Sequence, residues 1–178
     1  MTNVIQLAPL VRPSAPPPPY AELVTTSKFS FLRGGSDPEE LVSAAMHMGL
    51  AGLGICDRNS FAGVVRGHVV ARALKEKFPD FRYVVGVRLV FADGTPDIIA
   101  YPTDRDAYGR LCQLLTRGNL RKEAEKGDCR IKFSDLADFA EGQLFIFLCD
   151  EKRFVQSEMM LAALAGLAPG SVWLAANL

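Results

Sequence analysis

Histidine and paired cysteine, from which many protein metal sites are built, are scarce in this sequence. Its 178 residues include two histidines, His47 and His68, and both fall within segments whose pattern predicts helices. The four cysteines are scattered, with no C-x-x-C pair among them: Cys56, Cys112, Cys129 and Cys149. This spacing gives neither a zinc knuckle nor a disulfide framework, and neither histidine is placed as a metal ligand.

An excess of charge and a long apolar segment are also absent. Twenty basic residues balance twenty acidic ones, whereas proteins that bind nucleic acid mainly through phosphate contacts normally carry a basic excess. No apolar run is long enough to span a membrane, and the N-terminus lacks the basic and apolar regions of a signal peptide. We therefore expect a cytoplasmic protein with no membrane partner.

Glycine-rich nucleotide loops and the G-x-S-x-G nucleophile motif are missing as well. What is present is an ordinary globular composition, with 49% hydrophobic and 22% charged residues, at a length that suits one domain. The first 19 residues end in RPSAPPPP, and a proline run cannot donate backbone hydrogen bonds. Residues 1–19 are therefore expected to be a disordered leader, and residues 20–178 to be the domain.

Short apolar segments alternate with helical ones along this domain. Strands are expected at six places: 20–26, 51–55, 82–91, 96–101, 144–149 and 171–176. Asp93-Gly94 is a strong hairpin signal between the third and the fourth, and the other strands follow crossovers of helical length. The predicted fold class is α/β, with mainly parallel strands and one hairpin. An eight-stranded barrel needs more strands, so the sequence looks incomplete.

Polar residues mark where the helices are expected to begin. Ser36 with Glu39 predicts a capping box at the start of the first helix, and Gly49 is expected to end that helix. Besides this first helix, four more are expected. One covers about 60–77, one begins after Thr103, one begins after Ser134, and an apolar one covers 153–167. These helices and the strands between them give the alternation of an α/β fold.

Several segments run in the order seen at the start of bacterial C-family DNA polymerases. They are ELVTTSKFSFLRGGSDPEELV, LGICDRNSFAGVVRGHVVA, VVGVRLVFADGTPDIIAYPTDRDAYGRLCQLLTRG and EKGDC. The sequence is most similar to the error-prone, DNA-damage-associated branch. The resemblance implies a PHP domain, a distorted barrel with a metal site at its strand ends, and here a partial PHP-type (β/α) barrel. The polymerase's own metal-binding aspartates lie in the palm of these relatives, so no residue here is predicted to be catalytic.

The resemblance also locates the metal ligands of an active PHP domain. Its first motif, His-x-His, falls on Val24 and Thr26. Its Asp-His motif reads Asp57-Arg58, and its Gly-x-Glu motif ends on Arg88. Valine has no lone pair to donate and guanidinium is cationic, so Asp57 alone keeps a ligand's chemistry. We predict that this chain binds no cofactor, although active relatives hold a divalent metal.

The two arginines suggest an ion pair in place of the metal. We expect Asp57 to pair with Arg58 or Arg88 through charge-assisted hydrogen bonds. The alternative is that both arginines point to solvent.

A charged stretch near the middle of the chain is the other candidate site. It holds six basic residues against Glu123, Glu125 and Asp128: Arg117, Arg121, Lys122, Lys126, Arg130 and Lys132. This surplus could contact DNA or a neighbouring polymerase module. The alternative is a solvated loop, because aromatic residues are not interleaved with the charges.

Four functions are compatible with the sequence. The first is a non-catalytic structural module of an error-prone polymerase, which acts in DNA repair and damage-induced translesion synthesis with DNA and polymerase modules as partners. The second is a stand-alone PHP-type phosphoesterase or exonuclease. The third is an interaction module, and the fourth a truncated product without a role of its own. An open barrel edge also predicts self-association.

Overall fold

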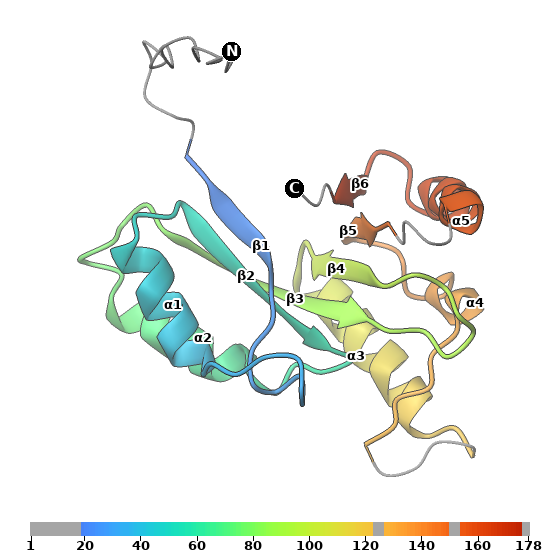
Figure 1. The fold of residues 1–178 in the computed structure, drawn as a ribbon, viewed down its shortest axis with the longest axis horizontal. Helices are drawn as coiled ribbons and strands as arrows, with labels where there is room; N and C mark the ends of the chain where they lie inside the picture. Colours follow the sequence, from blue (N-terminus) through green and yellow to red (C-terminus); the bar gives the residue numbers. More distant parts are fainter. Residues whose placement is uncertain (1–18, 123–126, 150–153, 176–178) are drawn as a thin grey trace, which may run out of the picture.

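The computed structural model describes residues 19–122, 127–149 and 154–175 of the chain (Figure 1). Apart from Pro19, the expected leader at 1–19 lies outside these residues. None of the helices described is both long and apolar enough to cross a membrane.

The described part of the chain forms one six-stranded sheet that curves into half of a barrel. Its strands are β1 (Ala21–Thr25), β2 (Gly52–Arg58), β3 (Arg82–Leu89), β4 (Ile98–Pro102), β5 (Gln143–Leu148) and β6 (Val172–Ala175), and they lie in chain order. The pairs β1–β2, β2–β3 and β5–β6 are parallel, whereas β4 is antiparallel to both of its neighbours. The predicted mixture of five like-directed strands and one hairpin partner is confirmed.

The described helices are α1 (Pro38–His47), α2 (Val64–Ala73), α3 (Arg105–Asn119), α4 (Phe133–Leu136) and α5 (Phe154–Leu167). The predicted start of α2 at residue 60 was wrong by four residues. Asn59 has a left-handed φ of 46° and its side-chain amide bonds the carbonyls of Val90 and Cys129. This turn delays the helix until Val64.

The helices pack against the convex face of the sheet. On the side of α1 and α2, the buried core contains Val42, Leu53 and Ile55. A larger core lies under α3, α4 and α5, and its fully buried residues include Leu111, Phe145 and Phe147. Figure 1 shows the two helix groups at opposite ends of the sheet.

The concave face of the half-barrel carries a smaller apolar cluster. Its most buried members are Cys56, Ile99 and Tyr101. The side chain of Tyr101 lies over the backbone of β3 and β2: a Cβ on Gly86 would come within 2.4 Å of its ring, and a Cβ on Gly54 within 2.1 Å of its hydroxyl oxygen. Its hydroxyl donates to the carbonyl oxygen of Leu23. One side chain of β4 thus reaches across β3 and β2 to β1.

Candidate functional site

The carboxyl ends of β2 and β3 bring two arginines together. Arg58 is the last residue of β2 and Arg88 the last but one of β3, and the two are register partners. Side chains alternate between the faces of a strand, so the arginines share the concave face with Cys56, which precedes Arg58 by two residues. In open parallel sheets, this end of the strands is where ligands usually bind.

Both arginines bond one oxygen of a carboxylate that the sequence did not single out. Arg58 Nη1 lies 3.1 Å and Arg88 Nε 2.8 Å from Oδ2 of Asp97. Asp97 directly precedes β4, so the hairpin places it beside the end of β3. The expected ion pair of these arginines with Asp57 was wrong in its partner, and the alternative of fully solvated arginines is not what the structure shows.

Asp57 instead accepts hydrogen bonds from the loop after β1. Its Oδ1 accepts from the backbone N–H of Ser27 at 2.9 Å and the hydroxyl of Ser30 at 2.7 Å, and its Oδ2 accepts from the hydroxyl of Ser27 at 2.6 Å. Asp57 is 2% exposed and the two serines no more so. Strand alternation turns it to the convex face, away from the arginines.

The positions of the first metal motif carry no ligands. Val24 lies in β1 and lines the concave pocket, and Thr26 follows the strand. Within the described residues, no group of three or more histidine, cysteine or acidic side chains could hold a metal ion. The residues present therefore do not fit the divalent metal that the fold family implies, because one retained carboxylate is saturated by serines and two ligand positions carry cations.

Both histidines lie in helices, as predicted. His47 ends α1, where its Nδ1 lies 2.7 Å from the carbonyl oxygen of Ser43, and His68 is exposed on α2. Neither is at a strand end.

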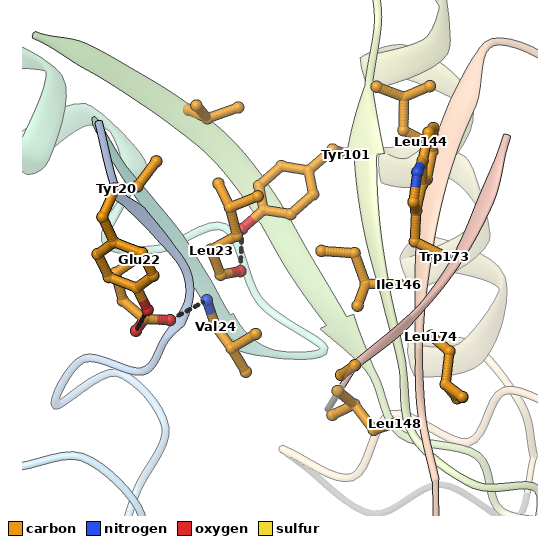
Figure 2. Close-up of a pocket in the computed structure, with 13 residues that line it drawn as sticks. Tyr20, Glu22, Leu23, Val24, Tyr101, Leu144, Ile146, Leu148, Trp173 and Leu174 are labelled. Atoms are coloured by element: carbon orange, nitrogen blue, oxygen red, sulfur yellow. Dashed lines mark hydrogen bonds between the residues drawn. The ribbon is translucent and has the colours of Figure 1, made fainter. Parts of the chain in front are cut away.

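An apolar pocket of about 710 Å³ occupies the concave face. Figure 2 shows Leu23 and Val24 of β1 on one side and Trp173 and Leu174 of β6 on the other, with Tyr101 between them. Burial raises the pKa of Cys56, on the floor of this face, to about 12, although the positive charge of Arg88 acts to lower it. Burial likewise raises the pKa of Tyr101. These groups stay neutral near pH 7.

The basic stretch is largely paired with aspartates. Arg117 bonds Asp138 at 2.6 Å, and Arg121 bonds both oxygens of Asp135. Arg130 lies 3.3 Å from Asp128. A small pocket of about 260 Å³ is lined by Ala92, Arg121, Arg130 and Lys132. Lys122 is exposed, and Lys126 lies outside the described residues.

Comparisons with known proteins agree with this architecture. A family model described as PHP domain matches residues 22–162. Error-prone DNA polymerase of Bradyrhizobium diazoefficiens is 48% identical over 171 residues, and that of Caulobacter vibrioides is 47% identical over 161 residues. Each alignment covers 90% of this chain and 14% of the relative, so the chain spans about a seventh of their length.

Two solved structures share the fold. An amidohydrolase from Chromobacterium violaceum superposes with a TM-score of 0.59 at 13% identity, over 85% of this chain and 75% of that one. A Bifidobacterium adolescentis protein assigned as a metal-dependent phosphoesterase gives 0.56 at 15% identity, over 89% and 78%. At these identities the likeness concerns the fold, and it confirms the predicted barrel class.

Proposed function

This chain belongs to the PHP domain family, and we propose that it serves as a non-catalytic structural module of an error-prone DNA polymerase. The identity to error-prone DNA polymerases over 90% of the chain supports this context. As parts of the same proposal, its partners are DNA and polymerase modules, its setting is DNA repair and translesion synthesis, and its location is the cytoplasm.

One observation carries the non-catalytic part of this proposal. Both oxygens of Asp57 are bonded to buried serines, and Arg58 and Arg88 stand at two other ligand positions. A divalent cation at this strand end would face two guanidinium groups, which repel it. The retained carboxylate therefore holds a loop in place instead of holding a metal.

The alternative is a metal-dependent phosphoesterase or exonuclease, as the assigned activity of one structural neighbour suggests. We expect the full chain with Mn²⁺ to hydrolyse neither p-nitrophenyl phosphate nor a 3′-labelled oligonucleotide above background. The proposal fails if turnover occurs, is abolished by Asp57→Asn and survives the matched control Asp138→Asn, which alters an exposed carboxylate paired with Arg117.

The structural role is tested in a chimera. Residues 20–175 would replace the corresponding segment of the Caulobacter vibrioides polymerase, and a deletion variant of that polymerase would lack the segment altogether. We expect the chimera to keep primer extension and the deletion to lose folded, active polymerase. A deletion variant that melts and extends primers like the unaltered polymerase would contradict a structural role.

Self-association of the isolated chain belongs to the same proposal. Among the described residues, β1 and β6 are the edge strands of the sheet, and unpaired strand edges invite pairing with another chain. The apolar pocket lies between these edges, so a second copy could cover it.

A further inference from the structure

The cluster formed by Arg58, Arg88 and Asp97 is here called the diarginine site, and its bonds to Asp97 engage only some of its guanidinium donors. We propose that it binds a phosphate group directly, through its guanidinium groups and without a metal. The inference rests on the geometry of these residues and holds whether or not the chain serves a polymerase.

Charge is the first argument. Two guanidinium groups meet a single carboxylate, and both bond the same oxygen, Oδ2 of Asp97. One negative charge cannot balance two positive ones, so a surplus of one positive charge remains on this cluster. Asp57 does not cancel it at short range, because its oxygens are bonded to Ser27 and Ser30 on the other face of the sheet.

The guanidinium donors that do not bond Asp97 are the second argument. A guanidinium has five N–H groups in a fixed fork. Arg58 donates to Asp97 from Nη1 and Arg88 from Nε, so Nη2 of Arg58 and both Nη atoms of Arg88 are not engaged by these bonds. Phosphate oxygens are the acceptors that match such forks, in single or bidentate bonds.

Position and exposure are the third argument. The side chains of Arg58 and Arg88 are 30% and 28% exposed, and that of Asp97 is 21% exposed. They are therefore held by the fold yet open to a ligand. The backbone N–H of Arg58 donates to the hydroxyl of Ser30 at 2.9 Å, and the strand register fixes Arg88 beside it. The donors are preorganised at the strand ends, where ligands of this fold class bind.

The surplus of one charge defines the ligand class. It matches a phosphate group with about one negative charge, such as a nucleic-acid phosphodiester or the doubly protonated inorganic phosphate H2PO4−. These two sources share the chemistry that the site recognises. The apolar cluster around Tyr101 adds no charge of its own, and Glu22 of β1 is the charged residue that lines the adjoining pocket.

Titration of the full chain with inorganic phosphate tests the proposal. Side-chain N–H signals of arginine in NMR spectra should shift saturably, and Arg58→Gln with Arg88→Gln should weaken binding at least about tenfold, since charge-assisted hydrogen bonds are lost. Asp97→Asn should strengthen binding about tenfold, because it removes the competing carboxylate and keeps both guanidiniums. Asp138→Asn, which frees Arg117 in the same way, should leave the affinity unchanged.

Asp97→Asn separates binding from a purely structural role. If the ion pairs only brace the hairpin, this variant loses stability and gains no affinity, and the proposal is overturned. Absence of saturable binding, or binding that the double arginine variant retains, overturns it as well. If the double variant does not fold, Arg58→Lys replaces it in the experiment. Lysine keeps the positive charge but lacks the forked donors of the guanidinium, so phosphate binding should weaken.

A second binding experiment distinguishes a nucleic-acid phosphodiester from free inorganic phosphate as the ligand. A short single-stranded oligonucleotide should bind more tightly than inorganic phosphate, in an Asp97-dependent manner, if the backbone of DNA is recognised. Equal affinity for both probes would assign the site to free phosphate. Either result requires phosphate binding and is independent of the chimera experiment, so the two proposals can fail separately.

Discussion

At the scale of single residues, Asp57 stands where the resemblance places a metal ligand, and its carboxylate holds the loop after β1. Asp57→Ala would leave the N–H of Ser27 and two buried hydroxyls without their acceptor. We expect the free energy of unfolding to fall by about 3 kcal/mol, in the range of broken buried networks, as measured by urea denaturation at pH 7.

Asp138→Ala is the matched control for this measurement. Its carboxylate is 63% exposed and pairs with Arg117, and exposed ion pairs contribute less than about 1 kcal/mol. Equal losses in the two variants would show that the serine contacts of Asp57 do not stabilise the fold.

Residue chemistry predicted that Asp57 alone keeps the chemistry of a metal ligand, but it did not predict which residues Asp57 contacts. The prediction that Val24 and Arg88 cannot be metal ligands follows directly from their side-chain types. The partners of Asp57 lie 30 and 27 residues away, and Asp97 lies 39 residues from Arg58. Such pairings depend on strand register and on loop conformation, which no local pattern contains. The serines of SKFS were visible in the sequence as polar residues after a strand, and this was the available signal.

At the scale of elements, helix starts were predicted to within one or two residues, α2 excepted. The capping box of α1 uses Asp37 with Glu40 in place of Ser36 with Glu39. The cap of α3 is Asp104, whose side chain accepts from the N–H of Ala107.

Tertiary contacts explain these shifts. The hydroxyl of Thr103, the expected cap of α3, donates to the carbonyl oxygen of Gly142. Ser134 lies inside α4, which begins after Lys132. Where several polar residues adjoin, the contacts of the folded chain select the one that caps.

The side chain of Tyr101 on β4 packs closely against the backbone of β2 and β3. A Cβ on Gly86 would lie 2.4 Å from the ring of Tyr101, a distance that the core cannot accommodate without movement. We expect Gly86→Ala to lower the free energy of unfolding by about 1–3 kcal/mol through overpacking, measured by thermal and urea denaturation. Gly86 was expected only as part of a metal motif, and its contact with Tyr101 gives it a structural reason.

Gly35→Ala serves as the control for Gly86→Ala. A Cβ at Gly35 meets nothing within 4 Å, so this variant should be as stable as the parent or slightly more so, because the unfolded chain loses freedom. If both alanine variants unfold alike, the close approach of Tyr101 does not constrain the sheet.

At the scale of the whole molecule, the alternation of apolar and helical segments was sufficient to predict the fold class. Apolar runs at 51–55 and 144–149 mark buried strands, and Asp93-Gly94 marks the hairpin. The pocket on the concave face was not predicted, because it depends on the curvature of the sheet and on side chains from both of its ends. The resemblance to PHP domains predicted the barrel that gives this curvature.

The two edges of the half-barrel predict how the isolated chain behaves in solution. Trp173 and Leu174 on edge strand β6 are 51% and 57% exposed, and both line the apolar pocket. Burying such residues between two copies removes apolar surface from water. We expect the full chain to form dimers or larger species at micromolar concentrations in sedimentation velocity, and Trp173→Glu to shift it toward monomer. Val65→Glu, at an exposed position on α2, should leave the distribution unchanged, and a parent chain that stays monomeric throughout would refute association through this face.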